Sequence, residues 1–172
     1  MIESDVFVQA LQDIGVEFFT GVPDPLLAGL IEALMERRQF VPATREDEAL
    51  AMASGAYLGG KVPAVFISTV GLGAASNILA SHHVPAQHPC VILLGWRGAA
   101  ASGAASMAAD GPECAVAGSK APAWLDQLGL PHRTLSVAGF VQDLRWAAET
   151  FMRQRVPVVL LLPKGVVKGL QP

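Results

Sequence analysis

Residues 62–77 read VPAVFISTVGLGAASN and predict a buried strand, a glycine-containing loop and the start of a helix. The first eight residues are almost all apolar, which is typical of a strand covered on both faces. The loop VGLG follows at 70–73, and the small residues after it open a helix that we expect over 74–83. Together these segments form one strand–helix unit of a parallel sheet.

The same alternation extends in both directions along the chain. Strands are expected at 16–22, 40–44, 89–96, 132–136 and 156–163, and helices at 3–15, 25–38, within 43–60, at 121–130 and at 137–155. The pattern predicts a single α/β domain, a parallel sheet of about six strands with helices on both faces. Right-handed crossovers would bring the loops at 21–24, 70–73 and from 97 onward to one edge, where open α/β sheets bind ligands.

Composition and charge argue against several classes of protein. Of 172 residues 52% are hydrophobic and 16% charged, so we expect a large core and a partner that covers part of the apolar surface. A net charge of −3 without a basic run argues against nucleic acid as a ligand. No apolar run reaches the roughly 18 residues of a membrane span. The polar start after Met1 and the presence of only two cysteines fit a cytoplasmic protein without a signal peptide.

One segment has low complexity. It reads RGAAASGAASMAADG from Arg97 to Gly111, within a loop that we expect to reach residue 118. Its alanine-rich part, 98–109, is either a flexible surface loop or a lid that orders when a ligand or partner binds.

Several isolated features have both a structural and a functional interpretation. The VGLG loop lacks the full spacing of a dinucleotide or P-loop fingerprint, so a plain tight turn competes with a phosphate cradle. Three histidines near a helix end are expected to interact with the helix dipole rather than to bind a metal, namely His82, His83 and His88. Arg97 ends a buried strand at the ligand edge and would hold either an anionic group or its own loop.

Three acids open the helix within 43–60. Glu46, Asp47 and Glu48 directly precede a run of small residues at 49–56. Taken alone, each is an ordinary acid at a helix N-terminus, where negative charge is favourable.

Five segments together resemble the phosphonopyruvate and sulfopyruvate decarboxylases, which use thiamine diphosphate. They are TGVPDPLL, REDEALAMASGAYLGGK, STVGLGAASN, ILLGWRG and WLDQLGLPHRTL, in the order and spacing of the N-terminal pyrimidine-binding (PYR) domain of that family. The resemblance covers nearly the whole chain and implies that residues 1–172 form one thiamine-diphosphate-binding PYR domain.

The resemblance implies roles for individual residues. Glu46, nine residues before Gly55, matches the catalytic glutamate that shares a proton with N1′ of the aminopyrimidine, whereas Asp47 and Glu48 are expected to be cap or surface charges. The positions that match cofactor-binding residues are Val22, Pro23, Thr69, Val70, Gly71, Leu72 and Gly73. The positions that match the substrate region are Asp24, Arg97 and Cys114.

Two departures and one missing motif qualify this interpretation. Ala74 stands where the family has Asn after GLG, and Cys114 in DGPEC stands where it has a histidine. The sequence contains no Gly-Asp-Gly, the motif with which a second (PP) domain of this superfamily holds the diphosphate and Mg²⁺. The resemblance therefore implies either a fragment or one subunit of a split enzyme. The split enzyme is the preferred hypothesis, with a PP-domain β subunit that holds Mg²⁺ in an α2β2 or larger assembly, and with no metal ligand on this chain.

Three functions stay open at this point. The first is the α subunit of a 2-keto acid decarboxylase that converts phosphonopyruvate or sulfopyruvate to the aldehyde and CO2. The second is a carboligase or acyl transferase subunit with the same cofactor, which the changes at Ala74 and Cys114 would suit. The third is a non-catalytic structural or regulatory subunit, against which the retention of Glu46 argues.

Overall fold

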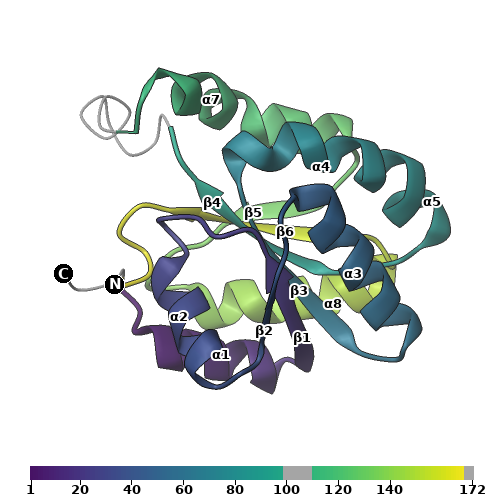
Figure 1. The fold of residues 1–172 in the computed structure, drawn as a ribbon, viewed down its shortest axis with the longest axis horizontal. Helices are drawn as coiled ribbons and strands as arrows, with labels where there is room; N and C mark the ends of the chain where they lie inside the picture. The colour runs from purple at the N-terminus through teal and green to yellow at the C-terminus, as the bar shows by residue number, and fades with distance from the viewer. Residues whose placement is uncertain (99–109, 169–172) are drawn as a thin grey trace.

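Six parallel strands form the centre of the domain in the computed structural model, which describes residues 1–98 and 110–168. The strands are β1 (Val16–Gly21), β2 (Phe40–Pro42), β3 (Val62–Ser68), β4 (Val91–Trp96), β5 (His132–Thr134) and β6 (Val158–Pro163). They form one sheet in the order β2-β1-β3-β4-β6-β5 (Figure 1). The predicted fold class is confirmed.

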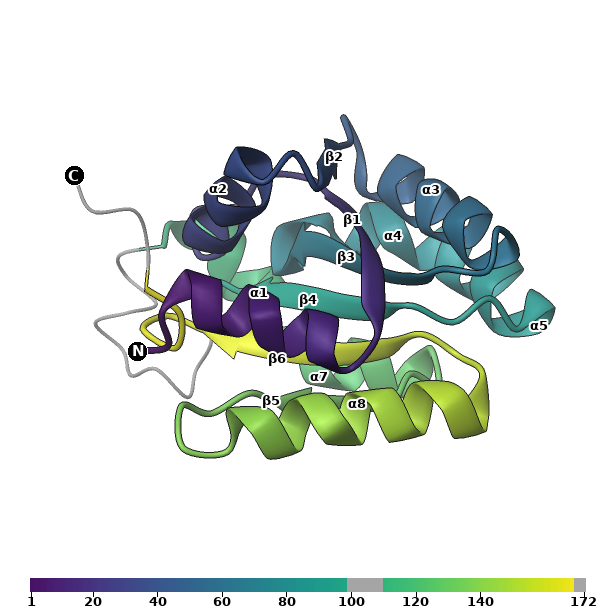
Figure 2. The ribbon, with the colours of Figure 1, turned by 90° about the horizontal axis from the view of Figure 1, so that it is seen from below.

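Helices connect the strands and cover both faces of the sheet. They are α1 (Ser4–Asp13), α2 (Ala28–Glu36), α3 (Glu46–Leu58), α4 (Leu72–Ile78), α5 (Val84–Ala86), α7 (Pro112–Gln127) and α8 (Phe140–Gln154), with a 3-10 turn η1 (Thr69–Gly71) and a π-helical turn η2 (Leu79–His83). One face carries α1, α2 and α8, and the other carries α3, α4 and α7. Figure 2 shows α1 beside α8, where the rings of Phe7 and Phe140 lie 6.2 Å apart. None of the helices in the described part of the chain has both the length and the apolar character that crossing a membrane requires.

The apolar strands divide their side chains between two cores. Successive residues of a strand point to opposite faces, so a continuous apolar run feeds both helical layers at once. The parallel register aligns equivalent residues of β3, β4 and β6 in rows across the sheet. The central rows are Phe66, Leu93 and Leu160 under α1, α2 and α8, and Val65, Ile92 and Val159 under α3, α4 and α7.

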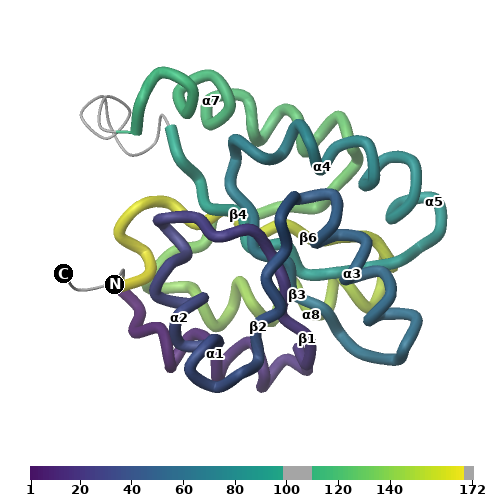
Figure 3. The backbone as a smooth tube through the Cα atoms, viewed as in Figure 1, coloured from purple at the N-terminus to yellow at the C-terminus, as the bar shows by residue number. Residues whose placement is uncertain are grey.

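The chain reverses its direction across the sheet after β2. It passes from β1 outward to β2 through α2 and returns to β3 on the other side of β1 through α3, a path that Figure 3 traces. Because each crossover is right-handed, the two helices lie on opposite faces. The loops that follow the neighbouring strands β1 and β3 therefore diverge, and such a divergence is the place where open α/β sheets commonly bind ligands.

The expected helix at 121–130 is too short and the expected loop up to residue 118 is too long. Helix α7 begins at Pro112, directly after Gly111, whose φ of 84° turns the chain into the helix. Gly118 packs so closely on the backbone of 97–98 that a Cβ there would overlap the Arg97 carbonyl. A run of small residues without apolar residues at helical spacing is typical of a loop. In this chain the small residues belong to α7 and allow it to pack closely against the backbone of 97–98. The alternatives of a surface loop or a lid concern residues 98–109, and residues 99–109 lie outside the described part of the chain.

Two helix starts also differ from the expected positions. Helix α2 begins at Ala28 rather than residue 25, because Asp24 accepts hydrogen bonds from Leu26 and Leu27 and closes a turn first. Helix α4 begins at Leu72 rather than residue 74, since the VGLG segment is helical throughout, with Val70 and Gly71 in η1 and Leu72 and Gly73 in α4.

Two helical glycines should respond in opposite ways to replacement by alanine. We expect Gly118→Ala to lower the free energy of unfolding by about 1–3 kcal/mol, because the new methyl group would overlap backbone atoms of 97–98. Gly55→Ala is the matched control, since nothing lies within 4 Å of its Cβ position, and it should raise stability by about 0.5–1 kcal/mol. Urea denaturation followed by circular dichroism measures both. A neutral or stabilising Gly118→Ala would contradict the close packing of α7.

Candidate active site

The ends of β1, β3 and β4 meet at one edge of the sheet, as predicted. The Val22 amide donates a hydrogen bond of 2.9 Å to the carbonyl of Phe66, which ties the segment after β1 to β3. The Thr69 hydroxyl donates to the carbonyl of Arg97 at 3.1 Å and ties the segment after β3 to the end of β4. The three loops thus form one connected surface.

The Glu46 side chain lies against the backbone of Gly71. A Cβ built at Gly71 would overlap the Glu46 carboxylate, so any residue other than glycine would displace it. Glu46 is half-buried at the first position of α3, and no side chain or backbone group of the described residues forms a hydrogen bond with its carboxylate. The structure therefore brings Glu46 and the VGLG loop together and leaves the acid available for another partner.

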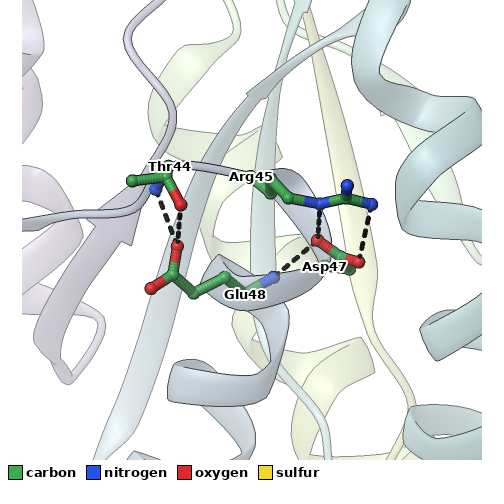
Figure 4. A network of polar contacts seen from close by, with 4 residues as sticks. All are labelled: Thr44, Arg45, Asp47 and Glu48. Atoms are coloured by element: carbon green, nitrogen blue, oxygen red, sulfur yellow. Dashed lines mark hydrogen bonds and ion pairs between the residues drawn. The ribbon is translucent and has the colours of Figure 1, made fainter.

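The two neighbouring acids are occupied by local contacts (Figure 4). The Glu48 carboxylate accepts hydrogen bonds from the Thr44 amide at 2.8 Å and the Thr44 hydroxyl at 2.6 Å. The Asp47 carboxylate accepts two bonds from the Arg45 guanidinium and one from the Glu48 amide. These contacts hold the pKa values of Asp47 and Glu48 below their ordinary range, chiefly through the bonds from Arg45 and Thr44. Both acids are cap or surface charges, as expected.

Asp24 is a buried carboxylate at the same edge. It is 4% exposed, packs against Gly95 of β4 and accepts a hydrogen bond from the Leu26 amide at 2.9 Å. Burial raises its pKa above the ordinary value, although the bonds from Leu26 and Ser68 and the charge of Arg97 act in the opposite direction. A carboxyl group with a raised pKa in a ligand-binding edge is typical of a functional site.

Arg97 is half-buried and helps to hold the start of the following segment. Its guanidinium donates to the carbonyl of Asp110 at 3.2 Å, and the next amide, Gly98, donates to the Asp110 carboxylate at 3.0 Å. These contacts agree with the hypothesis of a loop anchor. They involve only part of the guanidinium, which has further N–H donors, so a role toward an anionic substrate stays a prediction.

Cys114 is buried beneath the first turn of α7. Its carbonyl packs against Gly98, and its thiol donates a weak hydrogen bond of 3.7 Å to the Glu113 carboxylate. Burial raises the pKa of the Cys114 thiol, which makes it a poor nucleophile and proton donor. Its assignment to the substrate region stays a prediction.

The remaining residues that were predicted to bind the cofactor differ in their exposure to solvent. Pro23, Val70 and Gly73 are exposed, and Val22 is half-buried. Thr69 and Leu72 are buried as whole residues, backbone included, so neither presents a surface to a ligand in this structure, and their assignment to the cofactor site stays a prediction.

Sequence reasoning missed two residues of this edge, Ser68 and Asp110. Ser68 contacts Asp24, and Asp110 bonds to the chain at 97–98, so the main partner of each is distant in sequence. The one available signal was the position of Ser68, which ends a buried strand at this edge.

A groove of about 610 Å³ opens beside this surface. It runs along α2 and is lined by Pro23, Asp24, Pro25, Ala28, Ile31, Glu32, Met35 and Glu36. Neither Glu46 nor Arg97 contributes to its lining, so it is separate from the contact between Glu46 and Gly71.

Comparisons with known proteins agree with this arrangement. Residues 2–127 match the family described as "Thiamine pyrophosphate enzyme, N-terminal TPP binding domain". A protein named sulfopyruvate decarboxylase subunit alpha, from Methanocaldococcus jannaschii, is 35% identical over 91 residues, which are 52% of this chain and 54% of that protein. A phosphonopyruvate decarboxylase from Streptomyces hygroscopicus is 30% identical over 97% of this chain and 41% of that protein. The chain thus spans about half the length of these curated relatives.

A solved structure shows the same fold. The thiamine diphosphate-dependent 4-hydroxybenzoylformate decarboxylase of Rhodococcus jostii RHA1 superimposes with a TM-score of 0.77 at 19% sequence identity, over 98% of this chain and 31% of that one.

Asp24→Asn should stabilise the domain at neutral pH. A carboxyl whose pKa is raised on folding binds its proton more tightly in the folded state, so the free energy of unfolding falls as pH rises above the unfolded value of 3.8. The asparagine variant escapes this loss and keeps an oxygen for the Leu26 amide. We expect its melting temperature to exceed that of the wild type at pH 7, by a margin that shrinks as pH approaches 4. Glu17→Gln, at an exposed position of β1, is the control and should show no such trend. A margin independent of pH would contradict the raised pKa.

Proposed function

This chain belongs to the family of thiamine pyrophosphate enzymes, of which it carries the N-terminal TPP binding domain, and on that premise we propose that it is the α subunit of a 2-keto acid decarboxylase. The relatives named sulfopyruvate decarboxylase subunit alpha and phosphonopyruvate decarboxylase support this reaction and this class of substrate. The proposed substrate is accordingly a 3-sulfo- or 3-phosphonopyruvate, converted to the aldehyde and CO2.

The observation that carries the proposal is the Glu46 carboxylate against Gly71. Of the three acids that open α3, Glu46 alone has no hydrogen-bond partner in the described part of the chain. It lies against the backbone of Gly71, where any side chain would displace it, so the carboxylate and the peptide backbone of the VGLG loop are held side by side. The residues present therefore fit an aminopyrimidine.

In the proposed mechanism Glu46 holds a proton at N1′ of the aminopyrimidine. A carboxyl group in a poorly solvated site can share a proton with a ring nitrogen, and the N-terminal end of α3 favours the ionised form when the proton leaves. The backbone of η1 and the side chain of Val70 would position the ring beside it. When bound, thiamine diphosphate supplies the electron sink for cleavage of the bond to the carboxylate.

The substrate would lie toward Asp24 and Arg97. The guanidinium of Arg97 has N–H donors that bond no group in residues 1–98 and 110–168, and a sulfonate or phosphonate offers oxygens in the geometry that arginine recognises best. The raised pKa of Asp24 would lower its repulsion of such an anion, because the carboxyl is more readily protonated there than in water.

The diphosphate end of the cofactor and its Mg²⁺ would be held by a partner. We propose a PP-domain β subunit in an α2β2 or larger assembly, because the first of the relatives is named as one subunit of a decarboxylase. The pyrimidine end would then meet Glu46, and the charged end would meet the other chain.

Glu46→Gln should remove most of the activity of the assembled enzyme. An amide cannot exchange a proton with N1′, so kcat should fall by at least about 100-fold, the scale typical of acid–base groups. The measurement is decarboxylation of sulfopyruvate and phosphonopyruvate by the reconstituted complex, with pyruvate as the comparison substrate. Asp47→Asn and Glu48→Gln are matched controls, because both acids bond only to their neighbours, and each should keep near wild-type kcat. An equal loss in either control would show that the wrong carboxylate has been assigned.

The chain alone should bind thiamine diphosphate weakly. Without the partner only the pyrimidine end has contacts, so calorimetry on the purified chain should detect no tight, magnesium-dependent binding. Adding the β subunit with Mg²⁺ should restore affinity and raise the melting temperature through linkage. Tight magnesium-dependent binding to this chain alone would overturn the proposed division of the cofactor site.

A further inference from the structure

A second pocket, of about 330 Å³, opens at the amino ends of β3 and β4, at the edge of the sheet opposite the candidate active site. It lies between the last turns of α3 and α8, which Figure 2 shows ending on the same side of the molecule, on opposite faces of the sheet. Its side chains are of two kinds, apolar and cationic. The apolar part is formed chiefly by Tyr57, Val62, Phe151 and Met152, and the cations are Lys61 and Arg155. Among the described residues no acid lines it.

Two aromatic rings line the pocket in fixed positions. The ring of Phe151 is 4% exposed, and the Tyr57 ring stands edge-on to it, with centroids 6.4 Å apart. The Tyr57 ring also packs against the ring of His88, at 5.8 Å. Nδ1 of His88 lies 2.7 Å from the Ser54 hydroxyl, which in turn lies 2.9 Å from Nε2 of His82. These hydrogen bonds hold the imidazole that supports Tyr57, so the aromatic lining is preorganised for a ligand.

Each cation stands on a turn whose backbone is bonded to one of the aromatic residues. Gly60, with φ of 83°, turns the chain after α3, and its amide donates to the carbonyl of Tyr57 at 2.9 Å. Arg155 itself adopts the left-handed conformation, with φ of 54°, and its amide donates to the carbonyl of Phe151 at 3.1 Å. The two turns thus bring Lys61 and Arg155 from separate segments into the lining of one pocket.

The positive charge of the lining is not balanced by the protein. Neither Lys61 nor Arg155 forms an ion pair with any residue in 1–98 and 110–168. The chain as a whole is acidic, with a net charge of −3, so a lining with two cations and no acid is a local feature. Both cations also lie near helix C-termini, where positive charge is favourable. That interaction is satisfied by one cation at each helix end and does not require both to line the same pocket.

A smaller cavity of about 30 Å³ adjoins the pocket on its apolar side. It shares Val62, Phe151 and Met152 with the pocket, and the rest of its lining is apolar as well. Space for an apolar group therefore extends from the charged mouth toward the start of the central strands. Met152 is 71% exposed, and its flexible thioether can adapt to the shape of a ring that enters.

We propose that this pocket binds a small organic anion with an aromatic body and a carboxylate or phosphate as its charged group. The anionic oxygens bond to Lys61 and Arg155, which are suited to both kinds of oxyanion. The ring packs against Tyr57 and Phe151 in the edge-on or offset arrangement that aromatic groups prefer. The volume of the pocket is at the lower end of the roughly 300–1,000 Å³ of small-molecule sites, which fits a ligand with a single ring. The site lies apart from Glu46, and the inference does not rest on the proposed decarboxylase function.

Nuclear magnetic resonance on the full chain tests the proposal, with 3-phenylpropanoate and phenyl phosphate as probes. At least one of them should bind saturably, with a Kd of about 1 mM or tighter, and should shift the amide signals of 57–62 and 151–156. The probe that binds more tightly identifies the charged group. The uncharged 3-phenylpropan-1-ol, and propanoate and inorganic phosphate without a ring, should each bind at least about fivefold more weakly. Absence of binding by both probes, or equal affinity for the alcohol or for the ions without a ring, would overturn the proposal.

Substitutions in the lining test whether binding occurs in this pocket. Lys61→Gln and Arg155→Gln should each weaken binding of the tighter probe by about two- to fivefold, the range that one exposed ion pair contributes. Met152→Glu adds a negative charge to the lining and should weaken binding further. Arg153→Gln is the matched control, because Arg153 lies on the same helix but does not line the pocket, and it should leave affinity unchanged. All four positions are exposed, so the variants are expected to fold, which circular dichroism checks. Unchanged affinity when Lys61→Gln and Arg155→Gln are combined, or an equal loss in Arg153→Gln, would contradict the assignment.

Discussion

The reversal of the chain between β1 and β3 is the constraint on which the rest of the structure depends. These two strands are neighbours in the sheet, but the chain leaves β1 toward one face and β3 toward the other. Right-handed crossovers make this divergence unavoidable once the strand order is set. The edge at which the two loops diverge is where Glu46 lies against Gly71 and where Asp24 is buried against β4. The site is thus a consequence of topology before it is a consequence of any single side chain.

Close contact between backbones is the second recurring device. Gly71 admits the Glu46 carboxylate, and Gly118 admits the chain at 97–98, in each case because a side chain would occupy the same space. Such contacts place helices α3 and α7 within reach of the same edge of the sheet. They also explain why the helices at this edge are rich in small residues and carry few large apolar ones. Small side chains contribute little hydrophobic burial themselves, so the large rows of β3, β4 and β6 supply most of it.

The carboxylates at this edge of the sheet are placed in positions that do not favour the stability of the domain. Asp24 is buried, and burial disfavours its charged form and so raises the pKa of its carboxyl group. The three acids that open α3 differ in their contacts. Asp47 and Glu48 accept hydrogen bonds from neighbouring residues, whereas the Glu46 carboxylate bonds to no group in the described part of the chain. A fold selected for stability alone would replace the buried Asp24 and would bond the Glu46 carboxylate, and groups left in these states are typical of functional sites.

The sequence by itself determined the class of fold, the six strands and the edge of the sheet at which β1, β3 and β4 end, because these follow from patterns among neighbouring residues. Continuous apolar runs specify buried parallel strands, whereas the role of Glu46 was implied only by a family resemblance and stays a prediction. Only the tertiary structure decided that α7 begins at Pro112, that Asp24 is buried and that Ser54 joins two histidines. Each of these depends on contacts between distant segments, such as Ser54 with His88, which is 34 residues away. Local patterns carry no information about such contacts, because burial and hydrogen bonding between segments arise only when the sheet has aligned them.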